Sequence, residues 1–135
     1  GEGAARLMPR LRDHITAVAL RVPVANVSAL DIVLETCRHT SAEEVNRVLE
    51  EAAEVALKDV VGMERAPLVS RDFNHDPRSA IIDGSSTTVI GGNMVRLLAW
   101  FDNEWAYAAR LLDTALQMVN QYCPEAQRHG EKILL

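Results

Sequence analysis

Residues 94–118 have the sequence MVRLLAWFDNEWAYAARLLDTALQM, which predicts a buried strand, a polar turn and a long amphipathic helix. Apolar side chains occupy both alternating faces of residues 94–101, with one arginine as the exception, as in a strand covered on both sides. Asp102 and Asn103 then end the strand, and either side chain can cap the helix that follows. From Trp105 onward the apolar residues recur at helical spacing. A polar turn between two buried elements is a favourable place for a site.

The composition excludes several classes of protein. The 135 residues amount to about one domain, and 48% apolar and 24% charged residues are ordinary for a globular protein. The net charge of −5 argues against a general nucleic-acid binder, which is usually basic. Neither a run of about 18 apolar residues nor a signal peptide is present, so we expect no membrane partner. Cys37 and Cys123 lack metal-site spacing, and reduced thiols in the cytoplasm are expected.

Apolar periodicity and turn residues predict the other elements. A helix is expected over residues 41–57, because Ser41 and Glu44 match a capping box. A break that ends in Gly62 is expected over residues 59–62. Further strands are expected over residues 15–22, 27–36, 68–73, 79–83 and 87–90. Residues 91–93 form a glycine-rich hairpin turn. Because regular helices do not separate the strands, the predicted class is α+β: a mixed, largely antiparallel sheet with long helices packed on one face.

Two polar positions are candidates for ligand contacts. Arg21 lies late in an otherwise apolar predicted strand, where its guanidinium can clamp a phosphate or a carboxylate. The alternative is a structural ion pair with Asp31. Residues 102–104 place two acids at a helix start, which disfavours phosphate, so a neutral amide ligand would suit Asn103 there. The alternative is that all three residues only cap the helix.

Residues 72–76 resemble the start of a calcium loop, because acidic and amide side chains alternate and Asp83 falls at the twelfth position. Pro77 stands where that loop needs glycine, and the flanking segments are predicted strands, so a polar turn is favoured. The histidines have no ligand spacing and are interpreted as surface residues: His14, His39, His75 and His129. The sequence therefore predicts no metal site.

Three short segments form a pattern that is specific only in combination. They are Arg21-Val22-Pro23 with Asn26-Val27-Ser28, Leu68-Val69-Ser70 with Asp72-Phe73-Asn74, and Trp100-Phe101-Asp102-Asn103-Glu104-Trp105 with Tyr107. In this order and spacing, over about residues 6–118, they resemble the C-terminal half of phosphorylating glyceraldehyde-3-phosphate dehydrogenases. Residues 73–77, 82–84 and 112–114 look more like the erythrose-4-phosphate dehydrogenase branch.

The resemblance implies NAD-dependent oxidation of a sugar-phosphate aldehyde, in glycolysis or, for the erythrose branch, in pyridoxine biosynthesis. In the family a cysteine attacks the aldehyde, a histidine takes the proton, and hydride leaves the thiohemiacetal for the nicotinamide. Phosphate or water then splits the thioester. The family's chain has a Rossmann domain before the catalytic domain and forms a tetramer. Residues 1–135 are therefore expected to be a single partial catalytic domain of a homo-oligomer, with 124–135 as a loose tail.

The resemblance also assigns individual residues. It makes Arg21 a ligand of the substrate phosphate, Asn103 the contact of the nicotinamide carboxamide, and Tyr107 an aromatic beside the nicotinamide. Ala106 departs from the family's glycine. No catalytic residue is implied in this chain, because neither cysteine matches the nucleophile, no histidine matches the base, and no glycine-rich dinucleotide fingerprint occurs. The isolated chain is expected to be inactive. The alternative is a non-catalytic, stand-alone assembly or regulatory module of the same fold.

Overall fold

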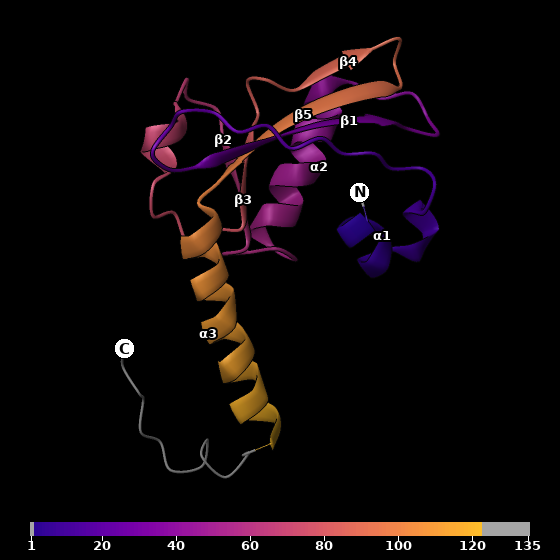
Figure 1. Ribbon diagram of the computed structural model, residues 1–135. Coiled ribbons are helices and arrows are strands. Elements are labelled where there is room, and N and C mark those ends of the chain that lie inside the picture. The colour runs from indigo at the N-terminus through magenta and orange to yellow at the C-terminus, as the bar shows by residue number, and fades with distance from the viewer. Residues whose placement is uncertain (1, 123–135) are drawn as a thin grey trace.

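A mixed sheet of five strands is the centre of the computed structural model, which describes residues 2–122 (Figure 1). The elements in chain order are α1 (Glu2–Leu7), the 3-10 turn η1 (Pro9–Leu11), β1 (Ser28–Glu35), α2 (Ala42–Glu54), β2 (Val61–Glu64), the 3-10 turn η2 (Ser70–Phe73), β3 (Ala80–Asp83), β4 (Thr88–Ile90), β5 (Met94–Phe101) and α3 (Asn103–Tyr122). The tail expected over residues 124–135 lies outside the described residues.

The central strand of the sheet is β5. It pairs antiparallel with β1 along its whole length, from Ser28 opposite Phe101 to Glu35 opposite Met94. β3 and β4 also pair antiparallel with β5, and β2 lies parallel to β3, which gives the order β1-β5-β3-β2 with β4 beside β5. The predicted α+β class and the strands at β3, β4 and β5 are confirmed. The hairpin turn is confirmed as well, because the two glycines between β4 and β5 both have positive φ.

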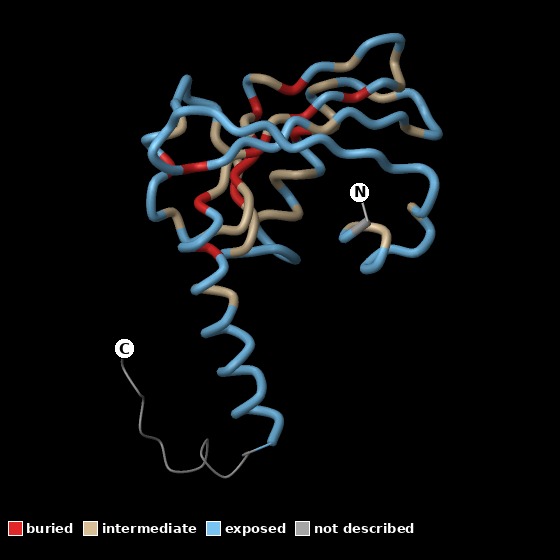
Figure 2. Tube along the Cα trace, in the orientation of Figure 1, coloured by how far each residue is buried: buried red, intermediate tan, exposed pale blue. Residues whose placement is uncertain are grey.

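Apolar packing occupies both faces of the sheet. Val95, Leu97 and Ala99 alternate along β5 and are buried on one face. On the other face Trp100 stacks on Phe73, with ring centroids 5.6 Å apart, beside the buried side chains of Val27 and Ile81. Figure 2 shows that the buried residues gather in the sheet and its adjoining loops. The turn between β5 and α3 therefore starts from the best-packed part of the molecule.

The strand predicted over residues 15–22 is wrong. Within the described residues this segment pairs with no strand, and its side chains are exposed, with Val18 at 86% and Leu20 at 83%. A strand needs a hydrogen-bonded neighbour, and an apolar run alone does not supply one. The second predicted strand begins only at Ser28, because Val27 takes a positive φ of 72°.

Residues 59–62 and 68–73 also differ from prediction. The segment 68–73 contains the turn η2 rather than a strand, because Oδ2 of Asp72 accepts a hydrogen bond from the backbone N of Val69 at 2.9 Å. Conversely, a strand, β2, begins within the expected break. Its Gly62 is buried because the guanidinium of Arg78 packs where a Cβ would stand. The glycine therefore permits close packing instead of ending an element.

The two long helices differ in their surroundings. α2 packs on β2, and Oγ of Ser41 caps it by accepting from the N of Glu44 at 3.2 Å. The second half of the predicted capping box is absent, because the Glu44 carboxylate binds the side chains of Thr40 and Arg38. α3 instead extends away from the sheet (Figure 1), and all of its residues after Arg110 are exposed. Its apolar stripe therefore has no cover among residues 2–122.

Candidate functional site

The Asp102 carboxylate joins three segments of the chain. Its side chain is almost fully buried, at 1% exposure. Oδ2 accepts hydrogen bonds from Nδ2 of Asn26 at 2.8 Å and from the backbone N of His75 at 2.9 Å. Oδ1 accepts from the backbone N of Trp105 at 3.2 Å. Because a buried charge needs partners, this carboxylate connects the loop before β1, the turn after η2 and the first turn of α3.

Strained backbone surrounds the same carboxylate. Asn26 also donates to Oδ1 of Asn74 at 2.6 Å, so the two loops are bonded to each other as well. The next residue after each of these asparagines lies in the left-handed region, with φ of 72° for Val27 and 62° for His75. For a β-branched residue this conformation is a genuine outlier, with a cost of about 1–3 kcal/mol that persists only where surrounding contacts enforce it.

Hydrogen bonding also controls the charge of Asp102. The backbone N–H of His75 makes the largest contribution, and it holds the pKa of the Asp102 carboxyl below its ordinary value. The N–H of Trp105 and the side chain of Asn26 act in the same direction, while burial opposes them. Asp102 is therefore an anion at neutral pH, and hydrogen-bond donors are the main groups that stabilise its charge.

An aromatic pair lies beside this carboxylate. The imidazole of His75 stacks on the indole of Trp105, with ring centroids 4.4 Å apart and an interplanar angle of 23°. A surface hollow of about 340 Å³ adjoins the pair and is lined by Asn26, His75, Asp102, Glu104, Trp105 and Ala108. The surface interpretation of His75 is confirmed, but its backbone N–H is part of the buried network.

The first turn of α3 presents the predicted cofactor contacts. Asn103 and Tyr107 are four residues apart, so they share one face of the helix, and both are exposed. Within residues 2–122 the Asn103 side chain forms no hydrogen bond, because Asp102 supplies the capping oxygen. Ala106 is buried at 5% exposure, so its methyl group points inward instead of toward Tyr107. The departure from glycine therefore leaves the exposed face of this turn unobstructed.

Arg21 is exposed, and in the described part of the chain it makes no hydrogen bond or ion pair. The alternative partner, Asp31, is bound by Arg96 instead, through Nε at 2.9 Å and Nη2 at 2.8 Å. The ion pair considered between Arg21 and Asp31 is therefore wrong. Arg21 precedes Asn26 by five residues, a span of at most roughly 18 Å. The bond between Asn26 and Asp102 thus brings the Arg21 loop to the turn that carries Asn103.

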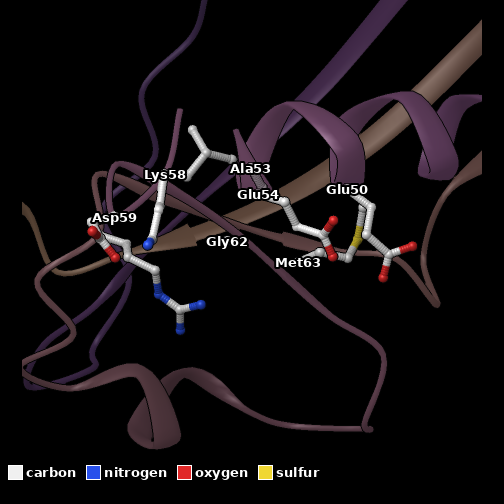
Figure 3. Close-up of a pocket in the computed structure, with 9 residues that line it drawn as sticks. Glu50, Ala53, Glu54, Lys58, Asp59, Gly62 and Met63 are labelled. Atoms are coloured by element: carbon white, nitrogen blue, oxygen red, sulfur yellow. The ribbon is translucent and has the colours of Figure 1, made fainter. Parts of the chain in front are cut away.

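A second hollow, of about 390 Å³, lies between α2 and β2 (Figure 3). It is lined by Glu50, Ala53, Glu54, Lys58, Asp59, Val61, Gly62, Met63 and Arg78. Several of its charges are already paired: Arg78 binds Asp76, and Glu50 binds Arg65 at 3.0 Å. No residue selected from the sequence lies here, and the mixture of acids and bases gives the hollow no single ligand preference.

The acids of the calcium-like segment do not converge. Asp72 accepts from the backbone of Val69, Asp76 pairs with Arg78, and Asp83 accepts from Ser85 and Ser86. Among the described residues, no group of three or more His, Cys, Asp or Glu side chains is arranged to hold a metal ion. No helix among the described residues combines the length and apolar character needed to cross a membrane.

Together, the mixed sheet and its strand–turn–helix site define an α+β domain. Residues 1–103 match a family model described as glyceraldehyde 3-phosphate dehydrogenase, C-terminal domain, and the chain belongs to this family. The resemblance seen in the sequence motifs is thereby confirmed. The matched range includes Arg21 and Asn103 and ends before Tyr107. Membership makes the chain part of a sugar-phosphate dehydrogenase family whose members are generally NAD-dependent.

The sequence motifs contained the anchoring residues but did not reveal their function. The sequence predicts Asp102 only as a helix cap and Asn26 only as part of a motif, because their separation of 76 positions hides the contact. A usable signal was the polar Asn26 between two apolar segments, since a buried carboxylate such as Asp102 requires donors and an asparagine amide can supply one.

Proposed function

We propose that this chain is part of an NAD-dependent aldose-phosphate dehydrogenase that oxidises glyceraldehyde 3-phosphate or erythrose 4-phosphate. Arg21 binds the substrate phosphate, and Asn103 and Tyr107 contact the nicotinamide, while the nucleophile, the base and the Rossmann domain belong to another part of the protein. The observation that carries the proposal is the hydrogen bond between Asn26 and Asp102, because it joins the Arg21 loop to the Asn103 turn.

The chemistry of these side chains fits their proposed ligands. A guanidinium offers two parallel N–H donors to a phosphate, and Arg21 has both free of partners within residues 2–122. The amide of Asn103 can both donate to and accept from a carboxamide, which has the same two groups. NAD, when bound, supplies the hydride acceptor. The role of this chain is to orient the nicotinamide against Tyr107 and to hold the phosphate end of the substrate.

The experiment measures NAD reduction by the native protein that contains this chain, with each aldose phosphate. Arg21→Ala should raise KM for the sugar phosphate at least roughly tenfold, since one charge-assisted contact corresponds to more than about 1.4 kcal/mol. Asn103→Ala should raise KM for NAD. Arg12→Ala and Gln117→Ala, exposed positions in the same regions, serve as matched controls. A native protein without activity toward either substrate contradicts the proposed function. Turnover by the isolated chain contradicts the proposal that the nucleophile and the base belong to another part of the protein.

Self-association through the uncovered end of the sheet face that carries Trp100 is part of the same proposal. Val33, Ile90 and Met94 are exposed there, at 62%, 68% and 48%, around the ion pair of Asp31 with Arg96. Exposed apolar groups on a flat sheet face are typical of an interface, and the family forms homo-oligomers. Light scattering at micromolar concentration should detect a dimer or larger species. A monodisperse monomer contradicts this part of the proposal.

The exposed stripe of α3 favours the second candidate, a stand-alone assembly module. Leu112 and Leu116 are 61% and 60% exposed and would dock on a separate protein in that case. In the dehydrogenase they dock within the same polypeptide. The intact mass of the protein in its native source distinguishes the two, because a dehydrogenase has a second domain on the order of 150 residues.

A further inference from the structure

We infer that Asp102 is a positioning residue, which holds the Arg21 loop and the Asn103 turn at a fixed separation. The inference rests on the proposed function only for the identity of the two ligands. The inference concerns the Asp102 side chain, which lies between the ligand-binding residues Arg21 and Asn103, rather than those two residues themselves.

The division of hydrogen bonds between the two carboxylate oxygens supports this role. Oδ2 binds the two loops, through Asn26 and the backbone of His75, while Oδ1 binds α3 through the backbone of Trp105. A rigid planar carboxylate therefore prevents the loops and the helix from shifting independently. The stacking of His75 on Trp105 adds a second contact between the turn after η2 and the first turn of α3. A site whose contacts come from separate segments needs such a supporting shell to keep its geometry.

Backbone strain indicates what happens without the carboxylate. Val27 and His75 both hold left-handed conformations, and each is bonded to the network directly or through the preceding asparagine. Relaxation of either φ to negative values would turn Asn26 or the His75 N–H away from Oδ2. Arg21 belongs to the same loop as Asn26, five residues before it, and Asn103 follows Asp102 directly, so both contacts would move.

The simpler alternative is that Asp102 only caps α3. Asp102→Ser separates the two roles, because a serine hydroxyl can still accept from the backbone N of Trp105 but cannot hold both loops. The matched control is Asn46→Ala. Asn46 is also buried and polar, and it bonds the carbonyl of Gly84 at 2.8 Å and the hydroxyl of Thr87 at 2.7 Å. None of these three residues belongs to the Asp102 network.

The first test uses hydrogen exchange on the chain itself, read by NMR. In Asp102→Ser, the side-chain amide of Asn26 and the backbone amide of His75 should exchange at least roughly tenfold faster, while the Trp105 amide keeps its protection. Asn46→Ala should leave the exchange rates of these three amides unchanged relative to the global exchange rate. Faster exchange at Trp105 alone, or equal effects of the two substitutions, would overturn the inference.

The second test uses steady-state kinetics of the native protein. Asp102→Ser should raise KM for the aldose phosphate and for NAD together, each about tenfold, because misplacement by about an ångström weakens both contacts. Asn46→Ala should leave both KM values unchanged. A rise in only one KM, or in neither, contradicts the positioning role. An inactive wild-type protein contradicts the proposed function, while the exchange result still decides whether Asp102 holds the loops.

Discussion

Nδ2 of Asn26 lies 2.8 Å from Oδ2 of Asp102, although the two residues are 76 positions apart in the chain. The antiparallel register explains the encounter. Ser28 is opposite Phe101 in the last pair of the ladder of β1 and β5. The segment before Ser28 and the segment after Phe101 therefore lie close together one or two residues beyond the ladder. The side-chain bond therefore continues the pairing of the strands where the backbone ladder stops.

Asn26→Ala is expected to destabilise the fold by about 1–3 kcal/mol. The substitution removes one of the hydrogen-bond donors of the buried Asp102 carboxylate. Most of the lost stability comes from leaving this charged group with too few donors. A lower midpoint of urea unfolding, with the same dependence of the unfolding free energy on urea concentration, measures the effect. Asn93→Ala is the control, because the Asn93 side chain bonds Glu35 at an exposed site. That control should change stability by less than about 0.5 kcal/mol, and an equal effect of both substitutions would contradict the prediction.

The pH dependence of stability should contain a contribution from Asp102. Its pKa in the folded state is lowered from the ordinary 3.8, chiefly by the backbone N–H of His75. The folded state therefore binds its proton less readily than the unfolded state, and the stabilisation is fully present above pH 3.8. It is lost as the pH falls through the lower folded value. The stability difference between wild type and Asp102→Ser, measured by urea unfolding, should be constant near neutral pH and shrink in acid. A difference that grows in acid would have the wrong sign.

Elements stabilised by local signals were predictable from the sequence. The apolar run of β5, the capping serine of α2 and the paired glycines before β5 each act within a few residues, and the structure has the strand, the cap and the turn. The α+β class follows from their order along the chain. Of the site, the exposed Asn103 and the acidic helix start were also visible in the sequence.

The errors arise where a distant segment decides the outcome. Residues 15–22 are an almost continuous apolar run, but a strand needs a neighbour that the described residues do not supply. Gly62 looked like a breaker, yet it lies within a strand because Arg78 packs against it. The Asp102 network could not be predicted for the same reason, since its donors come from loops far apart in sequence.

Gly62→Ala is expected to destabilise the protein by about 1–3 kcal/mol through overpacking. The new methyl group would overlap the guanidinium of Arg78, which is held in place by its ion pair with Asp76. In an Arg78→Ala background the same substitution should be much less harmful, and a double-mutant cycle measures this coupling. Gly3→Ala is the control, because its Cβ meets nothing within 4 Å. Additive effects of the Gly62 and Arg78 substitutions would show that the close contact is unimportant.

Ala106→Gly, which restores the family's residue, should lower the unfolding free energy by about 1 kcal/mol or slightly more. Glycine is less favourable than alanine within a helix by about that amount, and the buried methyl group is lost as well. KM for NAD should stay unchanged in the native protein, because the methyl group points away from Tyr107. Ala115→Gly, on the exposed part of α3, tests the helix effect without burial. A lower KM for NAD in Ala106→Gly would mean that the methyl group does disturb the cofactor contact.

Leu116→Glu should distinguish the surroundings of α3 in the isolated chain from those in the native protein. In the isolated chain the leucine is 60% exposed, so the substitution should change the unfolding free energy by less than about 0.5 kcal/mol. If α3 packs against another domain in the native dehydrogenase, the same substitution buries a charge there and should destabilise it by several kcal/mol. Gln117→Glu, at the neighbouring exposed position, adds the same charge and should be tolerated in both. Thermal unfolding of the four variants measures the contrast, and an equal, small effect of Leu116→Glu in both proteins would show that the stripe stays uncovered.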